Sequence, residues 1–224
     1  MCYTSCRFAV PADHWHAGGV ADGLRERKKE RTRALLQRAA LRLAVERGAQ
    51  QVTVADIAAA ADVSPRTYFN YFSSREQAFV ADDLERGRHF VALVTAAPED
   101  DAVWPVLRAA ALEAFGASAQ PREEELLKQQ LLRSSPEVLA HVLSTFDPLE
   151  RQLVHELRRR VGTGARALPH LLANAVIAAL RAAVEVWLAA ADSDFEQVLG
   201  ECFDVLAPAF VPLAHRPAAS PVRP

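Results

Sequence analysis

Residues 53–75 read Thr53-Val-Ala-Asp-Ile-Ala-Ala-Ala-Ala-Asp-Val-Ser-Pro-Arg-Thr-Tyr-Phe-Asn-Tyr-Phe-Ser-Ser-Arg75. Thr53 stands where a helix N-cap belongs, and Asp56 follows three residues later as a variant of the capping box. The apolar and alanine-rich run after this cap is short and contains no helix breaker. The first half of the stretch therefore predicts a short helix over residues 54–61.

The second half of the stretch predicts a turn and another short helix. Residues 62 and 63 form the turn, and Ser64 is the N-cap of the helix that follows. Pro65 occupies the first helical position, where a missing N–H group costs nothing. The second helix is predicted over residues 65–72, and the two helices together form a helix-turn-helix unit.

The second helix presents a polar face. Positions 66 and 70 lie on one line of the helix and positions 67 and 71 on the next, so Arg66, Thr67, Asn70 and Tyr71 share a side. An arginine can bind guanine, an asparagine can bind adenine, and a threonine methyl can contact thymine in the major groove. The face therefore predicts DNA reading, although such residues can also simply face solvent.

Other polar residues in the stretch are better placed to hold phosphate than to read bases. Thr53 and Ser74 begin helices whose free N–H groups favour anions, and Arg75 and Tyr71 lie within reach of the backbone. The predicted DNA-contacting residues are Thr53, Ser64, Pro65, Arg66, Thr67, Asn70, Tyr71 and Arg75.

The aromatic residues of the second helix predict how it packs. We expect Phe72 and one of Tyr68 and Phe69 to pack against apolar residues of the neighbouring helices. The expected partners are Leu43, Ile57 and Phe79.

Charge is distributed unevenly along the chain. Residues 24–75 contain eleven Arg and Lys against five Asp and Glu, a balance of +6, whereas the whole chain carries −2. A basic segment joined to an acidic remainder is expected when one part binds a polyanion and the other stays soluble. A solvated first helix is the alternative explanation.

The rest of the chain predicts further helices, and no strand pattern persists. With 50% hydrophobic residues, its 224 residues suffice for a full core in two unequal domains. The first helix is expected over about 24–47, closed by Gly48. Later helices are expected over about 76–95, 102–118, 122–133, 136–161 with Pro148 inside, 168–191 and 195–213.

The fold class is all-α, with about nine helices. The expected divisions are a disordered tail at 1–22, a DNA-binding domain at 23–75, a helical bundle at 76–213 and a disordered tail at 214–224.

The three cysteines, Cys2, Cys6 and Cys202, are too few for a disulfide framework, which fits a reducing cytoplasm. Cys2 and Cys6 with His14 and His16 do not predict a metal site, and no cofactor is expected. No apolar run is expected to span a membrane.

Residues 53–75 resemble the TetR family of transcriptional repressors. The family pattern is roughly Thr-Val-x-x-Ile-Ala-x-x-Ala-Gly-Val-Ser-x-x-Thr-x-Tyr-x-His-Phe-x-x-Lys-x-x-Leu. The chain matches it at Thr53, Val54, Ile57, Ala58, Ala61, Val63, Ser64, Thr67 and Phe72, and by conservative exchange at Arg75. It departs from the pattern at Asp62, where glycine is usual, and at Phe69 and Tyr71, where tyrosine and histidine are usual. An aspartate tolerates a left-handed turn, so we expect the same fold.

The resemblance implies an all-α homodimer that represses transcription. Two recognition helices about 34 Å apart would read a palindromic operator. The C-terminal bundle would bind a small, largely apolar effector that controls DNA binding. Expected ligand-binding residues are Trp104, Phe115, Leu127, Leu131, His141 and Phe146, although most could be core. Expected dimer residues are Ala178, Arg181, Glu185, Phe203, Leu206 and Phe210.

Alternatives remain open from the sequence, including a protein whose DNA-binding head is degenerate and which only binds a ligand. Two others can be described further. One is a helical enzyme with acid–base groups among His141, His155, Glu156 and His170, but no catalytic or phosphate-binding motif supports it. The other is an architectural DNA-binding protein without sequence preference. The sequence favours a regulator that is not an enzyme.

Overall fold

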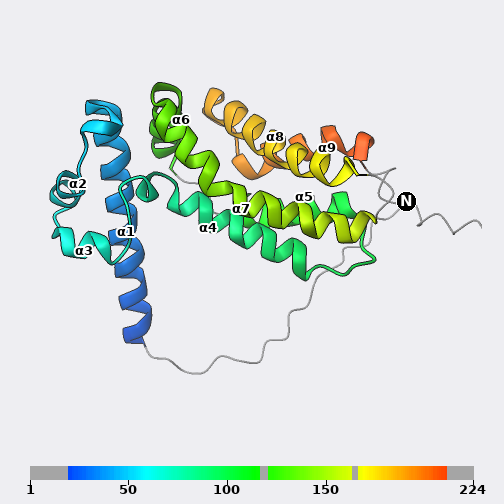
Figure 1. Cartoon of the computed structure of the whole chain (residues 1–224), viewed down its shortest axis with the longest axis horizontal. Helices are drawn as coiled ribbons and strands as arrows, with labels where there is room; N and C mark the ends of the chain where they lie inside the picture. The colour runs from blue at the N-terminus through cyan, green and yellow to red at the C-terminus, as the bar shows by residue number, and fades with distance from the viewer. Residues whose placement is uncertain (1–19, 117–120, 163–165, 211–224) are drawn as a thin grey trace, which may run out of the picture.

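The computed structural model describes residues 20–116, 121–162 and 166–210. Within these ranges the chain forms helices and no strand, as the sequence predicts (Figure 1). The elements are α1 (Val20–Arg47), the 3₁₀ turn η1 (Ala49–Gln51), α2 (Val54–Ala60), α3 (Pro65–Phe69), α4 (Gln77–Ala96), α5 (Val103–Ala111), the π-helix η2 (Leu112–Gly116), α6 (Arg122–Ser134), α7 (Pro136–Val161), α8 (Leu168–Ala189) and α9 (Phe195–Phe210).

The helices α1, α2 and α3 form an N-terminal head at one end of the molecule, and the remaining helices extend away from it as a body (Figure 1). The head has its own apolar core, in which Leu36 and Leu43 of α1 meet Ile57 of α2. Tyr68 and Phe72 join the same core. The expected packing of Phe72 and one other aromatic residue is confirmed.

The head core continues beyond residue 75. Residues 78–81 of α4 belong to it, as do Leu131 of α6 and Val138 of α7. The head and these three body helices therefore share one close-packed interior. The predicted boundary between residues 75 and 76 therefore does not separate two cores.

The body has a second core built from the far halves of α4 and α7 together with α5, α8 and α9. Trp104 of α5 lies at its centre, with its ring stacked on Phe210 at 4.8 Å between centroids. Its indole Nε1 donates to the carbonyl of Phe203 at 3.2 Å. This bond satisfies the one polar group of a fully buried tryptophan.

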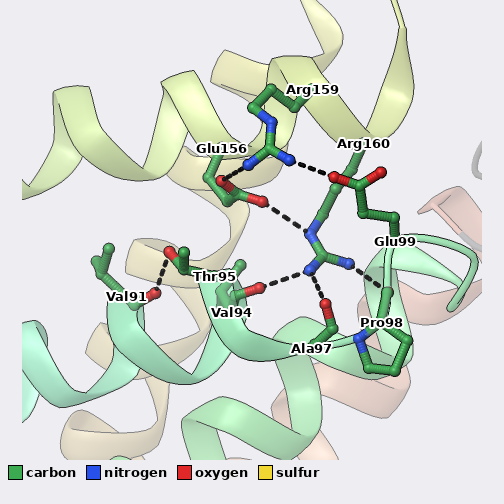
Figure 2. A network of polar contacts seen from close by, with 9 residues as sticks. All are labelled: Val91, Val94, Thr95, Ala97, Pro98, Glu99, Glu156, Arg159 and Arg160. Carbon is green, nitrogen blue, oxygen red and sulfur yellow. Dashed lines mark hydrogen bonds and ion pairs between the residues drawn. The ribbon is translucent and has the colours of Figure 1, made fainter.

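A buried arginine fastens α7 to the C-terminal end of α4 (Figure 2). Arg160 donates to the carbonyl oxygens of Val94 at 2.7 Å, Ala97 at 2.6 Å and Pro98 at 2.9 Å. Its Nε lies 3.3 Å from the buried carboxylate of Glu156. The carbonyls at a helix end lack hydrogen-bond donors within the helix and carry partial negative charge. The guanidinium supplies the donors and balances the charge.

Several predicted boundaries were wrong. α3 ends at Phe69 rather than residue 72, because Asn70 and Tyr71 donate to carbonyls three residues back in a tighter turn. The helix expected over 102–118 is α-helical only to Ala111 and continues as a π-helix to Gly116. Residues 20–22 belong to α1 rather than to a tail. The rest of that tail, residues 211–213 and the tail at 214–224 lie outside the described residues.

The expectation that no segment could span a membrane is not met by α8. By length and composition alone this 22-residue helix could cross one, and 33% of its apolar stretch is buried within the protein. α8 packs against α7 and α9 within the body. One such helix is weak support for a membrane span, and its apolar character is equally suited to a protein interface.

Candidate nucleic-acid interface

The first helix of the helix-turn-helix unit begins with a complete capping box. The Thr53 hydroxyl accepts from the Asp56 N–H at 3.1 Å, and the Thr53 N–H donates to the Asp56 carboxylate at 2.9 Å. Hydrogen bonds from the Thr53 side chain and backbone, with Arg47 nearby, lower the pKa of Asp56. These bonds define the first turn of α2, and the ion pair between Arg47 and Asp56 at 3.7 Å links it to the end of α1.

The turn between α2 and α3 depends on a left-handed residue. Asp62 has φ 54, and its N–H donates to Ala59 O at 3.1 Å. The N–H of Val63 donates to Ala58 O at 2.9 Å. This pair of bonds is the Schellman arrangement that commonly closes a helix before a turn. Asp62 thus takes the conformation that glycine usually supplies, as expected.

Ser64 is the N-cap of α3, as predicted. The Ser64 hydroxyl accepts from the Thr67 N–H at 3.1 Å, and the Ser64 and Thr67 hydroxyl oxygens lie 2.9 Å apart. One hydroxyl donates to the other within the cap. Thr67 is half-buried, so part of its side chain remains accessible to a base.

The outward face of α3 consists of Arg66, Phe69 and Asn70, with Pro65 at its start. Arg66 and Asn70 are exposed, whereas Tyr71 is half-buried against the head core. Phe69 is 58% exposed, and sequence reasoning placed no function on it. Its spacing of three residues from Arg66 was the available signal that it shares this face.

The inward face of α3 is anchored by Tyr68. Its side chain is fully buried, and its hydroxyl donates to the carbonyl of Ser74 at 2.9 Å. Burial, with a smaller effect from Glu76, raises the pKa of this phenol well above its usual range. The hydrogen bond fixes the recognition helix against the segment that leads into α4.

Arg75 is held within the protein. Its Nη1 donates to the carbonyl of Val52 at 2.9 Å, and its Nε donates to the Glu76 carboxylate at 2.9 Å. The ion pair helps to lower the pKa of Glu76 although burial opposes the shift. Arg75 thus ties the segment before α2 to the start of α4. The sequence predicted that Arg75 contacts phosphate, and it did not predict this structural role.

α4 begins at Gln77, and its N-cap residue is Glu76, which makes no side-chain cap bond, rather than the expected Ser74. The Ser74 hydroxyl accepts from the Gln77 N–H at 3.1 Å. The Ser73 hydroxyl bonds the Gln77 side-chain oxygen at 2.9 Å. The N-terminus of α4 is therefore already partly satisfied by protein groups.

Ion pairs connect the head to the body. Arg33 of α1 lies 3.1 Å from Asp82 of α4, and Arg38 of α1 lies 3.1 Å from Glu124 of α6. Burial raises the pKa of Glu124 despite this arginine. α6 therefore contacts the head both through the shared core and through a charged pair.

A second charged cluster joins α6 to α4. The ammonium of Lys128 is buried and lies 2.8 Å from Asp83 and 2.5 Å from Glu125. Arg86 also pairs with Asp83. Burial opposes ionisation of Asp83, but Lys128 and Arg86 outweigh it and lower its pKa. Burial likewise opposes the charge on Lys128, but the two carboxylates raise its pKa.

The six residues expected to bind a ligand are not brought together. Trp104 and Phe115 belong to the body core, whereas Leu127, Leu131 and Phe146 belong to the head core. His141 is half-buried on α7. None of the six lines the groove between α6 and α8 or the smaller cavity beside Arg108 and Asp204.

The larger cavity is an open groove of about 870 Å³ between α6 and α8. Arg122 at the start of α6 bridges to the end of α8, where it donates to Ala190 O at 2.9 Å and lies 4.7 Å from the Trp187 ring. The groove has both apolar and polar lining. Its residues are Leu126, Gln129, Gln130, Arg133, Ser134, Val184, Glu185, Leu188 and Ala189.

The expected dimer residues divide by exposure. Ala178, Arg181 and Glu185 are exposed on α8. Phe203 is fully buried in the body core of its own chain, and Leu206 and Phe210 pack against that core. An interface through Phe203 is therefore not available in this conformation. Further exposed apolar residues on the same two helices are Leu171, Ile177, Val186 and Val205.

The acid–base groups considered for an enzyme have other roles or lie apart. Glu156 pairs with Arg159 and Arg160, and His170 Nε2 lies 3.0 Å from Arg158. Across the described ranges no group of three or more His, Cys, Asp or Glu could hold a metal ion. The Cys2, Cys6, His14 and His16 set lies outside those ranges.

Comparison with known proteins gives the same assignment for both halves of the chain. Residues 36–81 match the model of the tetR family of bacterial regulatory proteins, and residues 101–211 match the MftR C-terminal domain of TetR regulators. The HTH-type transcriptional regulator TcmR of Streptomyces glaucescens is 27% identical over 208 residues, which cover 88% of this chain and 92% of that protein.

Solved structures of similar proteins include two from Thermus thermophilus. The TetR family regulator PfmR is 20% identical with a TM-score of 0.40, covering 76% of this chain and 96% of that one. The repressor FadR, solved with lauroyl-CoA, is 21% identical with a TM-score of 0.39. The match covers 85% of this chain and 100% of FadR. These scores are too low to support inferences about individual residues.

Proposed function

Because this chain belongs to the TetR family of bacterial transcriptional regulators, we propose that it is a sequence-specific cytoplasmic repressor whose operator binding is controlled by a small, largely apolar effector. One observation carries the DNA-reading part of this proposal. α3 exposes Arg66 and Asn70 while Ser64 and Tyr68 hold the helix from behind. A recognition helix needs this combination of free base-reading groups and a fixed backbone.

The repressor acts as a homodimer through α8 and α9. Four exposed large apolar residues of α8 and α9, Leu171, Ile177, Val186 and Val205, are available to such an interface. In a dimer with two-fold symmetry across these helices, both heads lie on one face of a duplex. The operator is therefore an inverted repeat. Ala178, Arg181 and Glu185 lie within the interface, and Leu206 lies at its edge.

The effector site is the groove between α6 and α8. Leu126, Val184 and Leu188 give it apolar surface, and the polar residues at its rim can orient a ligand. A ligand that separates the two helices moves α6. Movement of α6 strains its pairs with Arg38 and Asp83, so ligand binding is coupled to the position of the head.

The experiment for this function is selection of bound fragments from genomic DNA with the purified full-length protein. The proposal expects a single enriched motif with inverted-repeat symmetry. Enrichment without a shared motif would identify an architectural DNA-binding protein instead. Failure to retain any DNA would remove the DNA-binding function altogether.

Mass spectrometry of small molecules retained by the purified protein tests effector control. A retained compound is expected to release the selected fragment in a gel-shift titration. Substitution of Leu126 by Arg in the groove should abolish that release without weakening DNA binding. Release that persists in this variant would place the effector elsewhere.

A further inference from the structure

The N-terminal half of α1 extends beyond the part of the helix that packs on the head. α1 begins at Val20, and the first buried residues among its described side chains are Leu36 and Gln37. The match to the family's DNA-binding model also begins at residue 36. Residues 20–35 therefore precede the matched segment, and their described side chains are exposed or half-buried.

This extension is strongly basic. Between residues 25 and 31 it carries Arg25, Arg27, Lys28, Lys29 and Arg31 against two glutamates, a balance of +3. All five basic side chains are exposed. We call residues 25–31 the basic arm. A concentration of exposed positive charge on a protein of net charge −2 marks a surface for a polyanion.

The composition of the basic arm distinguishes between two anionic partners, a membrane surface and a nucleic acid. Residues 25–33 contain no large apolar side chain. An amphipathic helix that binds an anionic membrane surface needs an apolar face as well as basic residues. Phosphate binding along a duplex needs only the charges. The arm therefore fits nucleic acid better than a membrane.

The basic arm leaves the head beside the end of the recognition helix. Arg33, two residues beyond the arm, pairs with Asp82 at 3.1 Å, and its guanidinium carbon lies 5.8 Å from the centre of the Phe72 ring. Phe72 closes the turn after α3. Figure 1 shows this half of α1 running past α3 and away from the body.

The dimensions match those of DNA. The major groove is about 8.5 Å deep, so phosphates flank a helix that lies in it. From residue 33 to residue 25 the helix spans about 12 Å, or three to four base pairs at about 3.4 Å each.

We propose that the basic arm binds the phosphate backbone of duplex DNA just outside each half-site. It extends the footprint by about four base pairs per protomer beyond the region that α3 covers. The arm adds affinity and salt dependence but no base preference, because phosphates carry no sequence information. This inference rests on the proposed DNA-binding function.

The test uses a triple variant of the full-length protein, Arg25→Gln, Lys28→Gln and Arg31→Gln. A matched control changes three exposed arginines of the body to glutamine, at Arg88, Arg151 and Arg158. Both variants lose the same charge. Affinity is measured against salt on the selected site with long flanks, on the same site trimmed to the half-sites, and on a long duplex of random sequence.

The arm variant is expected to reduce the slope of log affinity against log salt by about 2 to 3 on both long duplexes, since each phosphate contact contributes about 0.9. On the trimmed duplex it should match the wild type, and the control should match the wild type throughout. Circular dichroism of both variants checks that α1 remains folded.

An unchanged slope on the long duplexes, or an equal loss on the trimmed duplex, would overturn the inference. A wild-type protein that binds random DNA as well as the selected site would refute the proposed repressor, while the slopes would still decide the role of the arm. A wild-type protein that binds no duplex would overturn both.

Discussion

Arg66 and Arg75 lie at opposite ends of the recognition segment and have different surroundings. Arg66 is exposed on α3, whereas Arg75 donates to the Val52 carbonyl and pairs with Glu76. A guanidinium can bind DNA only if its donors are free or can be released cheaply. Removal of Arg75 is therefore expected to lower the stability of the protein, and removal of Arg66 is expected to change its base preference.

Substitution Arg75→Ala is expected to destabilise the protein by about 1 to 3 kcal/mol, because the Val52 carbonyl and the Glu76 carboxylate lose a charged donor. Urea unfolding measured by circular dichroism provides the value. The variant should bind all DNA sequences more weakly in proportion to its loss of fold. Unchanged stability with a lower salt slope would instead assign Arg75 to phosphate.

Local sequence rules predicted the residues that define this segment, but not all their neighbours. Thr53, Asp56 and Ser64 act within a few residues of their own position, so their caps could be predicted. The bond from Arg75 to Val52 spans 23 residues, and no local pattern indicates it. Phe69 faces outward because Tyr68 and Phe72 fill the space beneath α3, which only the packed fold determines.

At the scale of elements, α6 joins the head to the body. One side of it meets α1 and α4 through Glu124 and Lys128, and another side lines the groove with Leu126 and Arg133. The charged contacts have discrete partners, so a shift of α6 must break or remake them. A helix with two such sides can convert ligand binding into movement of the head.

Substitution Lys128→Met tests this link. It leaves Asp83 and Glu125 buried without their shared cation, and we expect a loss of about 3 kcal/mol or more at neutral pH. The lowered pKa of Asp83 means that its contribution is present above about pH 4 and is lost as pH falls through the folded pKa. The raised pKa of Lys128 keeps the cation charged up to at least about pH 10.

Urea unfolding at several pH values measures this difference. The difference in free energy of unfolding between wild type and variant should be largest near neutral pH. It should become smaller as the solution is acidified below about pH 4. A gap that stays constant into strong acid would show that Asp83 does not depend on Lys128.

The arginines at the end of α7 give a second comparison between buried and exposed charge. Arg160 is 1% exposed and binds three carbonyls of α4 and its following turn, whereas Arg159 is 51% exposed. Arg160→Met should cost about 3 kcal/mol, and Arg159→Gln no more than about 1 kcal/mol. Thermal unfolding of both proteins provides the measurement, and equal losses would contradict the assigned cap.

Sequence patterns located most helices but misplaced some of their ends. Gly48 has φ 86 and ends α1 where expected, because glycine accepts a conformation that other residues avoid. α3 ends early where the N–H groups of Asn70 and Tyr71 donate to carbonyls three residues back, and no local pattern in the sequence indicates this tightening. The change to a π-helix at Leu112 has no comparable signal in the sequence, and we have no physical account of it.

At the scale of the whole molecule, helix amphipathicity predicted an all-α chain with a head and a body but could not assign each apolar face to a partner. Trp104 and Leu131 are both buried on regular helices, yet they lie in different cores. Phe203 faces its own chain, although its spacing also suits an interface. These distinctions depend on contacts between distant segments, which helical periodicity does not encode.

The substitution Ala178→Glu tests the proposed dimer. Ala178 is exposed on α8, so the change should leave the fold of a single chain intact while placing two carboxylates near the two-fold axis. Sedimentation equilibrium should show a monomer, and DNA affinity should fall by at least tenfold. Ala109→Glu, an exposed position on α5, is the matched control and should remain dimeric. A dimeric Ala178→Glu protein would exclude this face.

The most direct test of the central claim is selection of binding sites from random DNA by the wild-type protein and by Arg66→Ala in parallel. The account predicts an inverted repeat for the wild type. In the variant, one base pair of each half-site should lose its preference, at about 1 to 3 kcal/mol, while the other positions and the spacing stay the same. An unchanged motif in the variant, or no motif for the wild type, would contradict the assignment of α3 as the helix that reads the operator.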